Sequence, residues 1–162
     1  MEPDSELVDF VAQTLENMLI SPQYQDEEHG LQPDVKSTLD TALKDRYGAL
    51  FRSVISIGPD TPKPSVEMFG TSFWPDMEIL RGDKPVLGIE IKIIRKGQSA
   101  ARQLSEALGQ ALIYTIRYPN VIVFALHSGI YNPKLLREDP KMSRLLQKLN
   151  IRFVLRRHDT AG

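Results

Sequence analysis

The chain has 162 residues, of which 41% are hydrophobic and 25% charged, and its net charge is −1, as expected of one ordinary globular domain. No apolar run approaches the ~20 residues that span a bilayer, and the acidic N-terminus lacks the basic start of a signal peptide. We therefore expect a cytoplasmic protein with no membrane partner. The absence of cysteine excludes disulfides and zinc–cysteine sites.

Acidic and basic residues are distributed unevenly along the chain. Residues 1–50 carry 3 Lys/Arg and 11 Asp/Glu, whereas residues 101–162 carry 10 and 4. This asymmetry permits a surface that binds polyanions on the C-terminal half. Solvated charged faces of helices explain it equally well.

The N-terminal third is expected to be helical. Apolar residues recur at helical spacing over Ser5–Ile20, a polar loop is expected over Ser21–Pro33, and a second helix is expected from about Asp34 to Leu50. Alternation over Phe51–Ile57 favours a short strand. The proline-rich segment Gly58–Pro64 is expected to be a loop.

The rest of the chain alternates between strands and helices. Val66–Leu80 has the composition of strands, with a break or bulge at Gly70, and a turn at Arg81–Lys84 leads into a second strand from Pro85. The elements expected after it are a helix over Ser99–Arg117, a buried strand over Asn120–His127, a loop over Ser128–Pro133, a helix from Asp139–Pro140 to about Leu149, and an edge strand over Ile151–Leu155. This order predicts an α/β fold in which a mixed central β-sheet is flanked by helices.

Charged residues interrupt the strand pair at the centre of the chain. Glu90 and Lys92 share one face of the second strand, because successive side chains of a strand alternate, while Ile89, Ile91 and Ile93 share the other face. Fourteen positions before Glu90 stands an aspartate, Asp76, which a hairpin would fold back beside it. Two carboxylates and one ammonium group are thus expected to converge.

Such a cluster suits a hard divalent cation such as Mg²⁺, which prefers oxygen ligands. Asp76, Glu90 and the backbone carbonyl of Ile91 would provide them, and Lys92 would lie beside the attacking water and offset charge that builds on a phosphate. The simpler interpretation is a surface ion pair between Glu90 and Lys92. Glu78 shares the strand face of Asp76 and is a further candidate acid.

These residues resemble a known family. Pro75-Asp76 followed by Glu90-Ile91-Lys92 is similar to the PD-(D/E)XK nuclease signature, in a hairpin followed by a helix. Gln110 and Tyr114 on that helix resemble the Gln-x-x-x-Tyr motif of the RecB-like branch. The resemblance covers roughly Val66–Leu126. It implies a restriction-endonuclease-like core, with the whole chain as one nuclease-like domain and residues up to about 50 as an N-terminal helical extension.

The resemblance also implies an activity and roles for individual residues. It implies cleavage of DNA that depends on Mg²⁺ or Mn²⁺, with Asp76 and Glu90 as metal ligands and Lys92 beside the nucleophilic water. Gln110 and Tyr114 would brace the lysine or touch the substrate backbone. The main alternative is a nuclease-fold module without turnover that binds nucleic acid or a protein. A homodimer or a larger complex is plausible in either case.

Three questions remain open at this level. The family often adds a glutamate from its first core helix, for which Glu16, Asp45 or no acid at all are the options. Trp74 either stacks on a base or belongs to the rim of the core. Candidate phosphate-binding residues follow the lysine strand and extend toward the C-terminus: Arg95, Lys96, Arg102, Lys134, Arg137, Lys141, Arg144 and Lys148.

Overall fold

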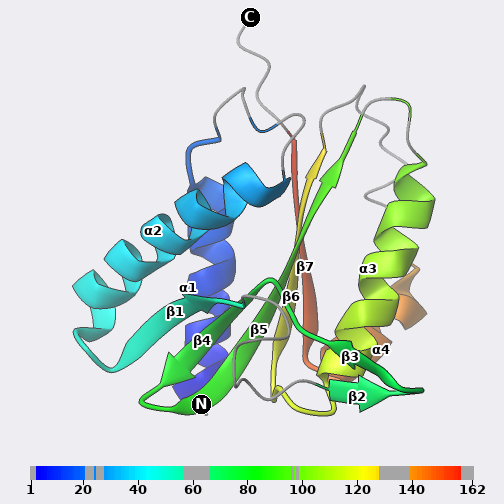
Figure 1. The fold of residues 1–162 in the computed structure, drawn as a ribbon. Coiled ribbons are helices and arrows are strands. Elements are labelled where there is room, and N and C mark those ends of the chain that lie inside the picture. The colour runs from blue at the N-terminus through cyan, green and yellow to red at the C-terminus, as the bar shows by residue number, and fades with distance from the viewer. Residues whose placement is uncertain are drawn as a thin grey trace, which may run out of the picture.

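A five-stranded mixed sheet lies between two layers of helices (Figure 1). The computed structural model describes residues 3–20, 24, 28–56, 66–95, 97, 99–127 and 139–157. The elements in chain order are α1 (Pro3–Asn17), α2 (Glu28–Tyr47), β1 (Phe51–Ile55), β2 (Val66–Met68), β3 (Thr71–Phe73), β4 (Met77–Arg81), β5 (Lys84–Ile94), α3 (Ala100–Tyr114), β6 (Val121–His127), α4 (Pro140–Lys148) and β7 (Ile151–Arg157). The predicted α/β class is confirmed.

The sheet combines an antiparallel half and a parallel half. Its strand order is β1-β4-β5-β6-β7, in which β1, β4 and β5 pair antiparallel while β5, β6 and β7 pair parallel. Parallel neighbours need a crossover connection, and α3 and α4 stand between the paired strands in the chain. Residues 121–126 of β6 are all buried, as the uninterrupted apolar run predicts for a strand covered on both faces. β7 is an edge strand, as predicted.

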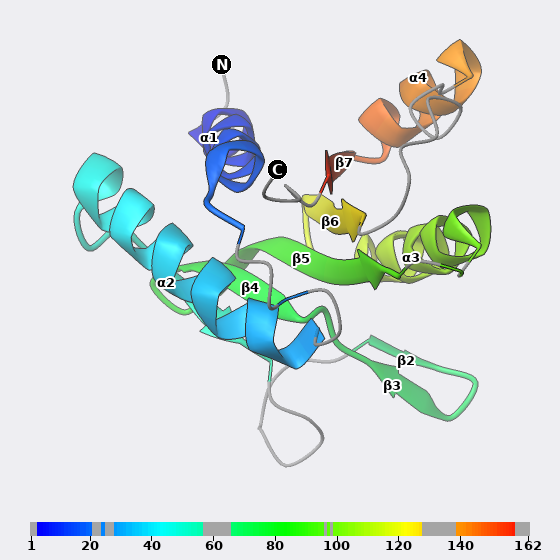
Figure 2. The same ribbon diagram turned by 90° about the horizontal axis from the view of Figure 1, so that it is seen from above.

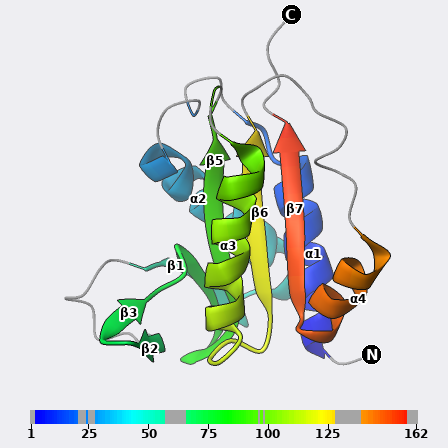
Figure 3. The ribbon, with the colours of Figure 1, turned by 90° about the vertical axis from the view of Figure 1, so that its right-hand side faces the viewer.

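The helices cover the two faces of the sheet in pairs. α1 and α2 lie on one side of the sheet and α3 and α4 on the other, as seen from above in Figure 2 and from the side in Figure 3. Ile89, Ile91 and Ile93 of β5 face α1 and α2 and share one core cluster with them. α1 and α2 are therefore one layer of the core. A second cluster, which contains Ala107 and Ala111, fills the space under α3 and α4.

One predicted boundary is wrong. The segment expected to be a loop through Pro33 belongs to α2 from Glu28 onward. A proline within a helix costs one backbone hydrogen bond and crowds the preceding turn, but here the buried stripe begins before the proline. Leu31 and Val35 are both fully buried, and the same four-residue spacing continues down the helix. Burial of this face outweighs the local cost, and the earlier start of α2 positions the site described below.

The expected break at Gly70 becomes a separate small hairpin. β2 and β3 form a two-stranded sheet of their own, and the chain then enters β4 at Met77. Phe69 and Gly70 form the turn, with φ angles of 53° and 73°. The loops expected over 58–64 and 128–133 lie outside the described residues. Within the described ranges, none of the helices is long and apolar enough to cross a bilayer.

Candidate active site

Asp76 lies immediately before β4, where it joins the sheet to α2. Its Oδ2 accepts a hydrogen bond of 2.7 Å from the Ile91 backbone N–H of β5, and its Oδ1 accepts one of 2.9 Å from Gln32 Nε2 of α2. The carboxylate is thus held at both oxygens by groups from two different elements. A side chain fixed in this way is already ordered before any ligand binds.

Pro75 gives a physical reason for the position of Asp76. Met77 pairs with Ile89 at the start of β4, so continuing this register would set Pro75 opposite Ile91. Proline has no N–H group, so Pro75 cannot donate to the Ile91 carbonyl oxygen as an ordinary strand residue would. The ladder ends here. The Ile91 N–H group binds the Asp76 side chain, and the Ile91 carbonyl oxygen is the third expected metal ligand.

Glu90 lies on the α3 face of β5 and is almost completely buried. Its side chain is 3% exposed and forms an ion pair of 2.9 Å between Oε1 and Lys92 Nζ, while the Lys92 side chain is 19% exposed. Its Oε2 lies 3.0 Å from the Tyr114 hydroxyl of α3. The structure therefore brings together the predicted residues Asp76, Glu90, Lys92 and Tyr114. The low exposure of Glu90 argues against an ordinary surface ion pair.

The surroundings of Glu90 favour its neutral form. Burial, followed by the nearby charge of Asp76, raises the pKa of Glu90 to about 7, although Lys92 and Tyr114 oppose the change. The Tyr114 hydroxyl, whose hydrogen bond favours the ionised form of Glu90, lies 2.7 Å from the carbonyl oxygen of Trp74 as well as 3.0 Å from Glu90 Oε2. Because a hydroxyl has one hydrogen, it donates to only one of these two acceptors at a time, so Trp74 competes for the hydrogen bond that would stabilise the Glu90 carboxylate.

A divalent cation fits this donor set. Two carboxylates and a backbone carbonyl provide only oxygen ligands, which Mg²⁺ and Mn²⁺ prefer. A nearby cation stabilises the ionised form of a buried acid, so it would take the place of the proton on Glu90. In the part of the chain that the structure describes, no three His, Cys, Asp or Glu side chains are grouped to hold a metal. Water and substrate oxygens would complete the ligands, as is usual for Mg²⁺.

Gln110 is placed one helical turn before Tyr114. α3 connects two parallel strands, so it runs in the direction opposite to β5. Moving one helical turn back from Tyr114, about 5.4 Å, therefore corresponds to moving fewer than two residues forward along β5 from Glu90. Gln110 therefore lies at about the level of Lys92. Its Oε1 is buried and has no hydrogen-bond partner among the described residues. The Gln-x-x-x-Tyr pair therefore adds one satisfied hydroxyl and one unused acceptor to this side of the site.

A second buried acid, Glu78, lies two residues along β4 from Asp76. Its side chain is 2% exposed. Burial, together with the charge of Glu78, raises the pKa of Tyr118. Gly88 pairs with Glu78 across the two strands, and a Cβ at Gly88 would meet the Tyr118 ring at 3.2 Å. Glu78 is therefore part of a buried cluster with Tyr118, beside the Asp76 site.

Among the described residues, no hydrogen bond or ion pair joins either candidate for an additional N-terminal acid to Asp76. Glu16 is exposed on α1, which packs on β6 and β7. Asp45 is exposed and lies thirteen residues beyond Gln32 on α2, or about 20 Å along the helix. The residue that the structure places there is Gln32, which sequence reasoning missed. The four-residue spacing from Leu31 onward could have revealed its helix.

The predicted phosphate-binding residues have different environments. Arg95 is exposed just beyond the end of β5, and Lys96 lies outside the described residues. Arg102 is exposed on α3 and forms a 3.0 Å ion pair with Glu106. Farther along, Lys134 and Arg137 are not described, whereas Lys141, Arg144 and Lys148 are exposed on α4, which Pro140 opens as expected.

Two C-terminal arginines attach α1 to the sheet. Arg152 forms an ion pair with Asp9. Arg156 donates hydrogen bonds to the carbonyl oxygens of Leu15 and Met18, at the C-terminal end of α1, where a cation also interacts favourably with the helix dipole. Some of the arginines that make the C-terminal segment basic therefore hold α1 on the sheet.

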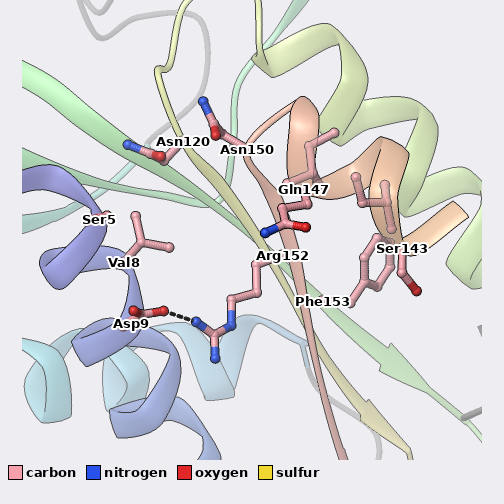
Figure 4. Close-up of a pocket in the computed structure, with 11 residues that line it drawn as sticks. Ser5, Val8, Asp9, Asn120, Ser143, Gln147, Asn150, Arg152 and Phe153 are labelled. Carbon is pink, nitrogen blue, oxygen red and sulfur yellow. Dashed lines mark hydrogen bonds and ion pairs between the residues drawn. The ribbon is translucent and has the colours of Figure 1, made fainter. Parts of the chain in front are cut away.

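A polar cavity of about 410 Å³ lies between α1, α4 and the beginning of β7. Figure 4 shows the Asp9–Arg152 ion pair on one side of it and Gln147 on the other. Asn120, which also lines it, precedes β6, whereas Lys92 pairs with Ala125 farther along that strand. The cavity is therefore separate from the carboxylate site.

Comparisons of the chain with models of known families, with curated proteins and with solved structures found no match.

Proposed function

We propose that the chain is a metal-dependent nuclease of the PD-(D/E)XK type that hydrolyses phosphodiester bonds in DNA with Mg²⁺ or Mn²⁺. The observation that carries the proposal is the placement of Glu90. This carboxylate is nearly fully buried, it lies 2.9 Å from Lys92 Nζ, and Asp76 is fixed beside it in the segment that precedes β4. Two neighbouring acids beside one lysine are costly to bury unless a cation or a proton compensates them. The order of elements over residues 66–127 agrees with the core that the resemblance implies.

Each residue of the site then has a separate task. When bound, the cation would lower the pKa of a water molecule and neutralise charge on the phosphate. Lys92 donates a hydrogen bond to the attacking water or to a phosphate oxygen, where negative charge builds. Tyr114 and Gln32 hold the carboxylates of Glu90 and Asp76 in place. The water oxygen bonds to phosphorus, one ester P–O bond breaks, and the products are a phosphate monoester and a free hydroxyl group.

The test is cleavage of plasmid, linear duplex and single-stranded DNA by the purified chain with Mg²⁺, with Mn²⁺ or with EDTA. We expect Lys92→Ala and Asp76→Ala to lower the rate by about 100-fold or more. Lys44→Ala and Asp83→Asn remove the same charges at exposed positions, and we expect them to cleave like the wild type. If the wild type cuts no substrate and calorimetry detects no bound metal, the proposal is wrong.

One observation favours the alternative of a binding module without turnover. All four oxygens of Asp76 and Glu90 already receive hydrogen bonds or ion-pair contacts from the protein, from Gln32, Ile91, Lys92 and Tyr114. A module of this kind would bind DNA equally well with Mg²⁺ and with EDTA and would hydrolyse none. Binding and cleavage measured on the same samples separate the two functions.

A further inference from the structure

The tip of the β2–β3 hairpin carries an aromatic residue where local physics disfavours one. Phe69 and Gly70 are the central residues of the turn, and both have positive φ, of 53° and 73°. This is the geometry of a type I′ turn, for which Asn-Gly is preferred, and positive φ is unfavourable for a bulky side chain. The Phe69 side chain is also 94% exposed. Neither the backbone conformation nor burial explains a phenylalanine here, which points to a contact with another molecule.

The base of the same hairpin is fixed to the candidate active site. Val66 pairs with Phe73 and is buried, and Phe73 packs against the core cluster that contains Tyr114. The next residue, Trp74, accepts the Tyr114 hydrogen bond through its carbonyl oxygen. Figures 1 and 2 show the hairpin beside the end of α3, with its tip directed away from the sheet. The hairpin therefore holds its tip at a set position relative to the site.

The sequence separation limits the distance between the tip and the site. Phe69 lies seven residues before Asp76. A fully extended chain covers about 3.3 Å per residue, so the two residues are at most about 23 Å apart. Successive nucleotides of a B-form strand rise by 3.4 Å, so this distance corresponds to about seven nucleotides.

We infer that Phe69 stacks on an unstacked nucleobase of the substrate, within about seven nucleotides of the cleaved phosphate. The inference rests on the proposed function. The substrate would be DNA with an accessible base, such as a gap, a flap, a mismatch or an end. A base needs only one exposed ring to stack on, whereas a protein partner needs about 800 Å² of surface. Gly70 and Thr71 beside the ring are exposed and small, so they add little apolar area.

Binding measurements with three variants test this inference. In EDTA, wild type, Phe69→Asn, Phe69→Trp and Glu67→Gln are titrated into a fluorescent duplex with a three-nucleotide gap and into its fully paired counterpart. Loss of one stacked base should weaken binding of Phe69→Asn to the gapped duplex by about 5- to 100-fold, with no change for the paired duplex. Phe69→Trp should bind like the wild type. Glu67 is exposed on the same hairpin, and its variant should bind at least as tightly.

Thermal unfolding of the same proteins excludes a folding defect. Because Asn-Gly is the preferred type I′ pair, Phe69→Asn should unfold at the same temperature as the wild type or higher. A variant that is more stable and yet binds gapped DNA less well has lost a contact.

The outcomes separate the inference from the proposed function. If the wild type cleaves DNA and Phe69→Asn binds and cleaves the gapped duplex equally well, stacking is wrong and the nuclease assignment stands. If no DNA is cleaved but binding of the gapped duplex depends on Phe69, the nuclease assignment is wrong and stacking stands. If the wild type neither cleaves DNA nor binds either duplex, both are wrong, and a protein partner becomes the remaining use for the exposed ring.

Discussion

Replacing Glu90 with glutamine should stabilise the metal-free protein and abolish its activity. In the metal-free site, ionisation of Glu90 is opposed by burial and by Asp76. Glutamine has nearly the same shape as the protonated acid, so it can accept from Lys92 and donate to the Tyr114 hydroxyl without carrying a charge. It cannot serve as a carboxylate ligand for Mg²⁺.

The pKa of Glu90 sets the size of this effect. A carboxyl group whose pKa rises from 4.5 to about 7 on folding contributes stability that is fully present below pH 4.5 and is lost as the pH rises through 7. At 1.36 kcal/mol per pH unit, the loss is about 3 kcal/mol. Glu90→Gln does not undergo this loss. Its advantage over the wild type should be about 3 kcal/mol at pH 8.5 and about 1 kcal/mol at pH 5.5.

Thermal and urea unfolding in EDTA at the two pH values measure the advantage. For a domain of this size, about 3 kcal/mol corresponds to an increase of roughly 10 °C in Tm. Millimolar Mg²⁺ at pH 8.5 should raise the Tm of the wild type and leave that of Glu90→Gln unchanged. Glu106→Gln makes the same substitution at an exposed glutamate on α3, and we expect a change below about 0.5 kcal/mol at either pH.

Two results would refute this reasoning. If Glu90→Gln and the wild type are equally stable at pH 8.5 in EDTA, ionisation of the buried carboxylate does not lower the free energy of unfolding. Its charge then needs no cation to compensate it. If Mg²⁺ stabilises both proteins by the same amount, Glu90 is not a ligand.

Three further substitutions test the support around the site. Tyr114→Phe removes a hydrogen bond that lowers the pKa of Glu90, so it should cost about 1 kcal/mol and move the pH of half-maximal cleavage upward; an unchanged pH–rate profile would argue against this contact. Gln32→Glu adds an acid beside the aspartate that it contacts, so calorimetry should show tighter Mg²⁺ binding and unfolding in EDTA a lower Tm; weaker Mg²⁺ binding would place the cation elsewhere. Gly88→Ala brings a Cβ to 3.2 Å from the Tyr118 ring, and urea unfolding should show a loss of about 1–3 kcal/mol; unchanged stability would mean that the ring moves aside freely.

The local pattern of the sequence determined which residues form the centre of the site. Alternation in the second strand placed Glu90 and Lys92 opposite three buried isoleucines, and the short turn before it returned Asp76 to the same place. The spacing of Gln110 and Tyr114 placed both on one side of a helix. These features depend on strand and helix periods and on tight turns, all of which act over a few residues.

The tertiary structure decided the features that depend on residues far apart in the chain. Gln32 reaches Asp76 from 44 positions away, and it does so because burial keeps Pro33 inside a helix. The ionisation of Glu90 depends on how completely α3 covers it. The hydrogen bonds of Arg156 to the end of α1 likewise depend on the packing of α1 against β7. Burial and long-range contacts arise only when all the layers assemble, so no local pattern of residue types reveals them.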